Sequence, residues 1–227
     1  MASVKMEDVQ LQGQLEVDST YTKINLSGTR PENMPRLSKK RGKKSPVVGE
    51  FKSLRGLSHH KICIVTAIDE HDNILYRVSG LGQETTAKYE QYSDHFSGCK
   101  TIISDSDSSI ASFAANHDID TEQVASGKHT TANGNSLGDV NQLHQTLKDL
   151  VRSKHGISTR HLPGYLNWIA YLKGLKYSSD RDQIAGIVYN DLCTTEARFL
   201  RDDVSRTEQP ISLYEAYKEY QYGIYSA

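Results

Sequence analysis

The sequence predicts an α/β fold in which a mixed β-sheet is flanked by helices. Two observations support this class. Short runs rich in β-branched and aromatic residues recur up to residue 126, and apolar residues recur at helical spacing from Leu137 onward. The 227 residues are enough to bury one sizeable core, so we expect one domain with appendages rather than two full domains.

The first three strands are predicted from composition. Residues 15–26 are rich in Val, Thr, Tyr and Ile and place Asp18 in the middle of a strand. Residues 60–68 are β-prone and mostly apolar, and 74–80 resume this pattern after the turn-forming residues 69–73. The last two runs therefore predict a hairpin.

Helices and strands alternate in the next part of the chain. Residues 83–96 have helical spacing of aromatic and apolar side chains, and the strand 100–104 runs directly into Asp105. Residues 107–116 open with N-cap residue types and predict a short helix. Residues 121–126 predict one more strand, which a Gly- and Asn-rich loop, 127–136, follows.

Two longer helices are predicted after this loop. The first is amphipathic, and the second begins near Leu162, with Pro163 tolerated in its first turn. The apolar face of the first consists of Leu137, Val140, Leu143, Leu147, Leu150 and Val151, and the second carries Tyr165, Leu166, Ile169 and Leu172 at core spacing. Helical patterns over 180–200 and 211–222 predict a helical C-terminal extension, residues 176–227, and residues 1–14 are left as an N-terminal arm.

Several classes of protein are excluded by composition. No apolar run reaches the roughly eighteen residues of a membrane span, and the N-terminal residues show no secretory signal. A reducing, cytoplasmic location is therefore expected. Because Cys63, Cys99 and Cys193 are far apart and none belongs to a Cys-x-x-Cys pair, neither a disulfide scaffold nor a thiolate zinc site is expected.

A formal net charge of −1 hides a strongly basic insert at 28–58. Between Arg30 and Arg55 there are nine basic residues and only two acidic ones, and Pro and Gly residues predict an extended loop. Such a loop is either a solvated tether or a segment that binds DNA phosphates. The expected DNA-binding residues of the insert are Arg36, Lys39, Lys40, Arg41, Lys43, Lys44 and Arg55.

Two aspartates stand where they could face one another across adjacent strands. Asp18 lies on the first strand and Asp105 at the end of the fourth, and the long helix offers Asp139 or Asn141 as a third oxygen ligand. Metal-dependent phosphoryl transfer needs oxygen ligands of this kind. Taken singly, a residue of this kind is far more often an unrelated surface or capping group than a metal ligand.

Asn141 is the better third ligand because it shares one helix stripe with Gln145 and Lys148. An amide oxygen can coordinate Mg²⁺, and Lys148 would hold a DNA phosphate beside the metal. His144, one turn beyond Asn141, would reach the edge of this site or the scissile DNA strand.

Several segments of the chain resemble insertion-sequence DDE-type transposases, in the branch with Asn at the third catalytic position. The pattern of that branch is Asn-Val-Asn-x-x-His-x-x-Leu-Lys, then a His-Gly-Val-Ser-Thr-like run and Tyr-Leu-x-Trp. The matching segments here are DVNQLHQTLK, 139–148, and HGISTRHLPGYLNW, 155–168. Further upstream, VDSTY, 17–21, and IISDSDSSI, 102–110, resemble the strands that deliver the two aspartates, and SKKRGK, 38–43, with RGLS, 55–58, resembles the basic insert.

This resemblance covers roughly residues 15–175 and implies an RNase H-like catalytic domain that performs DNA transposition. It implies the catalytic residues Asp18, Asp105 and Asn141, with Lys148 as an accessory basic residue. Two Mg²⁺ ions, or Mn²⁺ in their place, would activate water to nick an element end and then the freed 3′ hydroxyl to attack target DNA. Asp18 would bridge both ions, and Asp105 and Asn141 would each complete one coordination sphere.

Some residues depart from the pattern of that branch. Ser19 stands in place of Glu, and Asp139 replaces the first Asn of Asn-Val-Asn. Asp107, two residues after Asp105, offers a further carboxylate, so Asp107 and Asp139 remain alternative ligands. Relatives usually begin with a zinc-ribbon or helix-turn-helix segment, which the sequence lacks, and a truncated transposase is therefore one expectation.

The expected partner is double-stranded DNA, both element ends and target, bound by a homodimer or higher oligomer without involvement of a membrane. The expected location is the prokaryotic cytoplasm, in association with the nucleoid. Two rival functions remain. One is an RNase H-like nuclease that cuts without joining, and the other is an inactive DNA-binding remnant.

Overall fold

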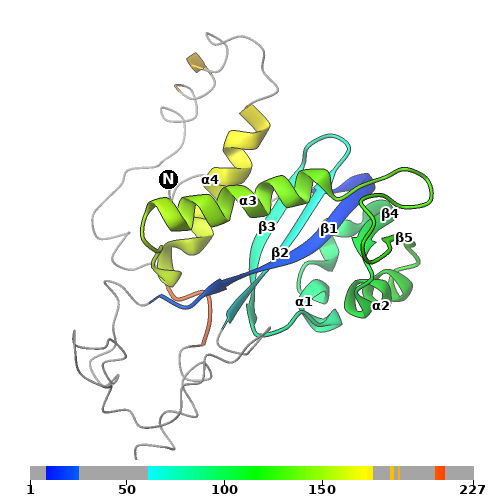
Figure 1. Cartoon of the computed structure of the whole chain (residues 1–227), viewed down its shortest axis with the longest axis horizontal. Helices are drawn as coiled ribbons and strands as arrows, with labels where there is room; N and C mark the ends of the chain where they lie inside the picture. Colours follow the sequence, from blue (N-terminus) through cyan, green and yellow to red (C-terminus); the bar gives the residue numbers. More distant parts are fainter. Residues whose placement is uncertain (1–8, 26–60, 176–184, 187–188, 190–207, 213–227) are drawn as a thin grey trace, which may run out of the picture.

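The computed structural model describes residues 9–25, 61–175, 185–186, 189 and 208–212 (Figure 1). Within them, the predicted mixed β-sheet flanked by helices is confirmed. Five strands lie in the order β3-β2-β1-β4-β5. Their bounds are Gln12–Lys23 for β1, Lys61–Asp69 for β2, Ile74–Leu81 for β3, Gly98–Asp105 for β4 and Asp120–Val124 for β5.

The sheet is mixed because its central strand has one antiparallel and one parallel neighbour. β1 pairs antiparallel with β2, which pairs antiparallel with β3 as the predicted hairpin requires. On the other side β1 pairs parallel with β4, and β4 pairs parallel with β5. Since β1, β4 and β5 run in the same direction, side chains toward their C-terminal ends gather at one edge of the sheet.

A β-bulge interrupts the pairing of β1 with β4. Gly13 lies opposite Cys99 but Gln14 lies opposite Thr101, so Lys100 is the extra residue. Gly13 has a φ of +68°, a conformation that a residue with a Cβ adopts only at a cost. Beyond the bulge the register is regular as far as Glu16 opposite Ile103.

Helices cover both faces of the sheet, as Figure 1 shows. On one face α3 (Gly138–Ser153) and α4 (Leu162–Leu175) pack with Ile62 and Ile64 of β2. On the other face α1 (Thr86–Glu90), the 3₁₀ helix η1 (Ser93–Phe96) and α2 (Ser108–Asn116) pack around a second core, to which β2 contributes Val65 and Ala67. β2 is therefore buried on both faces, which explains its nearly unbroken apolar sequence.

Alternation along β1 directs its polar side chains to the face covered by α3. Leu15 and Val17 belong to the core on the α2 side of the sheet. Glu16 and Asp18 therefore project to the opposite side, where both contact residues of α3.

The helix predicted over 83–96 is wrong in its length. The segment forms α1 and η1, because Tyr92 leaves the helical conformation with φ −122° and ψ 12°. This break allows both Tyr89 and Phe96 to pack on Phe113 of α2, with ring centroids 5.9 and 5.1 Å from that of Phe113. Packing against α2 therefore overrides the helical spacing of the segment.

The predicted helices over 107–116, from Leu137 and from Leu162 are confirmed. α2 follows Asp107, whose carboxylate caps it by accepting the N–H groups of Ser109 and Ile110. The apolar face predicted for α3 is buried or packed against the core. In α4 the core stripe is shorter than predicted, because Leu172 is 39% exposed.

Some predicted features lie outside the described residues. These are the whole basic insert 28–58, most of the arm 1–14, and almost all of the extension 176–227. Cys63 is buried and Cys99 partly buried, as small apolar side chains are. Among the described helices, none combines the length and the apolar character that crossing a membrane requires.

Candidate active site

Asp18 and Asp105 lie on neighbouring strands. The pairing of β1 with β4 reaches Glu16 opposite Ile103, and the same register continued for two steps along each strand would set Asp18 opposite Asp105. Both side chains therefore project from the face of the sheet that α3 covers. Their proximity is felt electrostatically, since the charge of Asp105 contributes to a raised pKa at Asp18.

One cavity of about 500 Å³ is lined by Asp18, Asp105 and Asn141 together. These residues come from β1, from the end of β4 and from the N-terminal part of α3. The structure thus brings together the three oxygen-bearing residues predicted as ligands. The rest of the wall is the segment between β5 and α3, which contributes Val124, Ala125, Ser126, Gly127, Lys128, His129, Ser136, Leu137 and Gly138.

Asp18 is the more buried of the two carboxylates. Burial raises its pKa from 3.8 to about 7, and the charge of Asp105 adds to the rise. The N–H of Ser19, which donates to Oδ1 at 2.7 Å, and the charge of Lys148 act in the opposite direction. Burial likewise raises the pKa of Asp105, although its side chain is more exposed.

His144 lies beneath the carboxylates rather than on the surface. Its side chain is 4% exposed, its Nε2 is 2.9 Å from Oγ1 of Thr66, and its Nδ1 is 3.6 Å from Oδ2 of Asp18. Burial, with the charge of Lys148, lowers the pKa of His144 to about 4, so the imidazole is neutral at pH 7. The expected contact of His144 with DNA does not fit this burial, whereas the expected position at the edge of the site does.

Glu16 fixes the start of α3 relative to β1. Its Oε2 accepts the backbone N–H groups of Asp139 at 2.9 Å and Val140 at 3.1 Å, so a strand carboxylate caps the helix. Asn141 is the next residue along the helix. The interaction therefore holds Asn141 beside the strand that carries Asp18. Burial raises the pKa of Glu16, although these N–H groups act against the rise.

Neither alternative carboxylate lines the cavity. Asp107 is the N-cap of α2, where its Oδ1 accepts two backbone N–H groups. Asp139 forms an ion pair with Lys173 of α4, which also donates to Gln142 at 3.1 Å. Both carboxylates thus have structural partners. Asp105 and Asn141 therefore remain the candidate ligands beside Asp18.

Lys148 is exposed on α3 and does not line the cavity. It nevertheless lies close enough for its charge to lower the pKa values of both Asp18 and His144. Its position beside the cavity suits the predicted contact with a flanking phosphate. Gln145, on the predicted stripe, instead donates to Asp149 at 2.9 Å.

The donor set fits a divalent cation that prefers oxygen ligands. Two carboxylates and an amide oxygen converge on the cavity, and a cation among them would offset the repulsion that raises the pKa of Asp18. Among the described residues, no three or more His, Cys, Asp or Glu side chains are grouped to hold a metal ion. Asn141 is the third oxygen-bearing residue that was predicted as a ligand, and its side chain lines the cavity with the two carboxylates.

Lys128 and His129 are cavity residues that the sequence did not single out. They belong to the loop predicted at 127–136, which follows β5 and therefore begins at the edge of the sheet where Asp105 ends β4. This position could have identified the two residues from the sequence, because a loop that follows a parallel strand at this edge has to pass the site.

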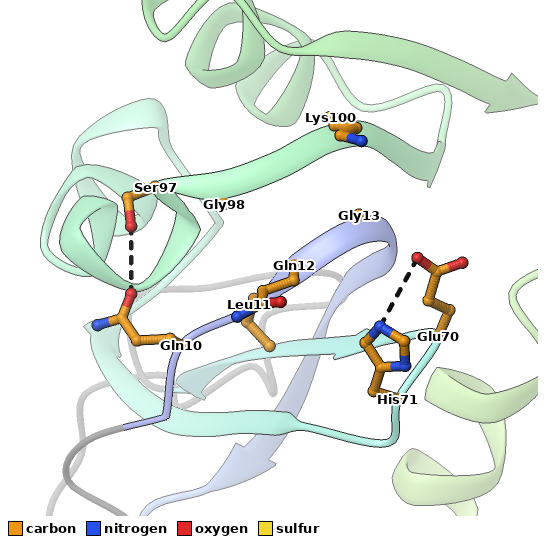
Figure 2. Close-up of a pocket in the computed structure, with 9 residues that line it drawn as sticks. All are labelled: Gln10, Leu11, Gln12, Gly13, Glu70, His71, Ser97, Gly98 and Lys100. Carbon is orange, nitrogen blue, oxygen red and sulfur yellow. Dashed lines mark hydrogen bonds and ion pairs between the residues drawn. The ribbon is translucent and has the colours of Figure 1, made fainter.

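A second cavity, of about 430 Å³, lies at the opposite end of β4 (Figure 2). Its wall includes Gly13 and Lys100 of the bulge, and Glu70 and His71 from the turn after β2, which form a long ion pair of 4.0 Å. Only one carboxylate lines it, so it offers less to a cation than the cavity of Asp18 and Asp105.

The predicted DNA-binding residues of the basic insert, Arg36 to Arg55, lie outside the described residues.

No protein-family model matches the chain, and no curated protein matches its sequence.

Proposed function

We propose that the chain is the catalytic part of a DNA transposase that cuts and joins DNA strands with divalent metal. The observation that carries the proposal is the shared cavity of Asp18, Asp105 and Asn141, residues from three separate elements. The resemblance of residues 139–148 and 155–168 to one branch of DDE-type transposases points the same way.

We also propose that the fold is RNase H-like. Support comes from the strand order, in which an antiparallel meander β1 to β3 is extended on the other side of β1 by two parallel strands. Further support comes from the position of α3, which crosses the face that carries Asp18. Fold alone does not define a reaction, so the function rests on the cavity.

Three residues of the cavity and three beside it have defined roles in the proposed reaction. Asp18, Asp105 and Asn141 would hold two Mg²⁺ ions, which Mn²⁺ could replace, and the ions would supply charge stabilisation for an in-line displacement at phosphorus. Glu16 orients Asn141 through the start of α3. His144, neutral and buried, keeps Asp18 in place from beneath, and Lys148 would bind a flanking phosphate.

Cleavage and joining can be tested without knowledge of the element ends. We expect nicking of supercoiled plasmid, and transfer of a labelled oligonucleotide with a free 3′ hydroxyl, both in Mg²⁺ or Mn²⁺ and neither in excess chelator. Asp18→Asn should lower both rates by more than about 100-fold, because outer-sphere partners alone account for 10- to 100-fold. Asp120→Asn is the matched control, since Asp120 is exposed at the start of β5.

The rivals give different results in the same assays. Metal-dependent nicking without transfer would indicate a nuclease that does not join strands. Binding of DNA with no metal-dependent reaction, unchanged in Asp18→Asn, would indicate a binding module and contradict the proposal.

A further inference from the structure

A single carboxylate ties down the loop that forms one wall of the cavity. Glu122 of β5 accepts hydrogen bonds from three loop side chains. Asn133 donates to Oε1 at 2.7 Å, and Thr131 and Asn135 donate to Oε2 at 2.9 and 3.0 Å. These donors lower the pKa of Glu122, with Asn133 the largest contributor. Glu122 is thus fully engaged and anchors the loop to the sheet.

The anchored part of the loop is also closed on itself. Thr131 is buried, its N–H donates to the carbonyl of Asn135 at 2.7 Å, and the N–H of Gly134 returns to the carbonyl of Thr131 at 3.1 Å. Thr130 and Ser136 form an isolated bridge at the base of this turn. The turn therefore has a fixed shape, and it fixes the two flanking stretches that line the cavity.

The wall held in this way carries basic side chains, in the same cavity as the two carboxylates. Lys128 and His129 line the same cavity as Asp18 and Asp105, and both are exposed. Within the described part of the chain, the ion pairs involve neither of them. A tight turn, in which the N–H of Lys128 donates to the carbonyl of Ala125 at 2.9 Å, sets the position of Lys128.

A ligand that fits between these walls must satisfy both. A phosphodiester does so, because its oxygens can face cations held by the carboxylates on one side and a lysine ammonium on the other. A metal cation alone would leave the ammonium of Lys128 without a partner, and an uncharged ligand would leave both sets of charges without one.

We propose that residues 125–137 form a phosphate clamp, in which Glu122 fixes the loop and Lys128, with His129 beside it, binds a backbone phosphate of DNA in the cavity. This inference rests on the proposed function and adds to it a binding residue outside the basic insert. Glu122 itself would not touch DNA; it is a positioning residue that acts through the loop.

The clamp is tested by binding, which does not depend on cutting. The probe is a fluorescein-labelled DNA duplex, and its anisotropy gives Kd in metal-free buffer at several salt concentrations. We expect Lys128→Ala to weaken binding about tenfold at low salt, as for one lost charge-assisted contact, and to lower the slope of log Kd against log salt by about 1. Lys128→Arg should restore the slope, and Lys100→Ala, at the second cavity, should behave as wild type.

The role of Glu122 needs a separate readout. In Glu122→Ala we expect trypsin to cleave after Lys128 faster than in wild type, with an unchanged thermal unfolding midpoint. Its DNA affinity should fall as in Lys128→Ala, and the double variant should show no further loss, because both changes remove one contact. Asn133→Ala, which removes an exposed donor to Glu122, gives the same test if Glu122→Ala does not fold.

Failure of the clamp and failure of the proposed function are distinguishable. If Lys128→Ala binds DNA with the affinity and salt slope of wild type, the clamp is overturned, whether or not the protein nicks plasmid. The clamp is also overturned if the wild-type protein does not bind DNA. If Lys128→Ala weakens binding while wild type shows no metal-dependent nicking, the clamp stands and the transposase proposal fails.

Discussion

Asp18 is a carboxylate placed where a negative charge is costly. It is largely withdrawn from water, it lies opposite Asp105, and its nearest ionisable neighbour on α3 is a neutral His144. A lone carboxylate in this environment binds a proton near pH 7, and a divalent cation is the alternative way to balance its charge. The proposed metal site would therefore relieve the charge of Asp18 where its surroundings do not.

The raised pKa of Asp18 predicts how stability depends on pH in metal-free buffer. Because the folded pKa of about 7 lies above the ordinary 3.8, the favourable contribution is complete below pH 3.8 and is lost as the pH rises toward 7. Asn at this position cannot ionise. The stability of Asp18→Asn relative to wild type should therefore rise across this window, by at most about 4 kcal/mol at 1.36 kcal/mol per pKa unit.

Urea denaturation at a series of pH values measures this difference, with Asp120→Asn as the control. Addition of Mg²⁺ at pH 7 should raise the stability of wild type but not of Asp18→Asn, because only the former has the complete ligand set. A pH-independent difference between Asp18→Asn and wild type would show that Asp18 is not perturbed in solution.

His144→Ala separates a buried positioning role from a DNA contact. Since His144 is 4% exposed and faces Asp18, its loss should lower kcat for plasmid nicking about tenfold or more and leave KM for DNA nearly unchanged. Steady-state kinetics of nicking measures both constants. A raised KM with an unchanged kcat would restore the original expectation that His144 binds DNA.

Individual residues were predictable from the sequence where a repeated pattern surrounds them. Asp18, Asp105 and Asn141 could be chosen because each stands in a segment with a defined strand or helix signal. The capping position of Asp107 also followed from the N-cap residue types at the start of its helix. The partner of Asp139 could not be predicted, because Lys173 lies 34 residues further along the chain. The burial of His144 likewise depends on strands far away in the chain.

At the scale of elements, α3 is held to the sheet by contacts at its N-terminal end. Glu16 accepts two of its free N–H groups, and Lys173 of α4 pairs with Asp139 in its first turn. Unpaired N–H groups at a helix start attract a carboxylate, so these contacts fix both the position and the rotation of the helix. The placement of the Asn141 side chain depends on both the position and the rotation of α3.

Substitution of Glu16 tests this attachment. Glu16→Ala should cost about 1 kcal/mol of folding free energy, the usual effect of losing a cap, and should also reduce nicking by displacing Asn141. Glu16→Gln keeps an acceptor oxygen and should recover most of the stability. Urea denaturation and plasmid nicking measure the two effects. Equal behaviour of the Ala and Gln variants would contradict a capping role.

The limits of prediction at this scale are visible in two segments. Helical spacing over 83–96 predicted one helix, but packing of Tyr89 and Phe96 on Phe113 divides it. The loop at 127–136 was correctly placed, yet its function as a wall of the cavity depends on Glu122, whose three partners only the folded loop brings together. A local sequence pattern predicts the type of an element better than it predicts the contacts that the element makes.

At the scale of the whole molecule, the site is a product of sheet topology. The parallel pairing of β1 with β4 joins segments separated by the entire hairpin β2–β3 and by α1. Strand positions could be predicted from composition, and an α/β sheet with flanking helices followed from their order. The register that sets Asp18 opposite Asp105 could not, because it is decided by long-range packing and by the bulge at Gly13.

Gly13 allows a test of that bulge. Gly13→Ala should destabilise the protein by about 1–2 kcal/mol, the cost of a left-handed conformation, and its Cβ would meet Oε1 of Glu70 at 2.2 Å. Gly13→Asn introduces the same Cβ but tolerates positive φ better, so it should be less destabilising. Thermal unfolding midpoints compare the two. Equal midpoints would mean that crowding, not backbone conformation, determines the effect.

The extra residue at Lys100 also determines which combinations of insertions and deletions the protein can accept. If the same sequence paired without the bulge, the spacing of Gly13 opposite Cys99 would continue, and Asp18 would lie opposite Ser104 with Asp105 on the other side of the sheet. The alternation of side chains along β4 therefore decides whether Asp18 and Asp105 lie on the same face of the sheet. Changes of length in the connection before β4 should therefore be tolerated, whereas insertion of one residue between Thr101 and Asp105 should abolish the proposed reaction while leaving a folded protein.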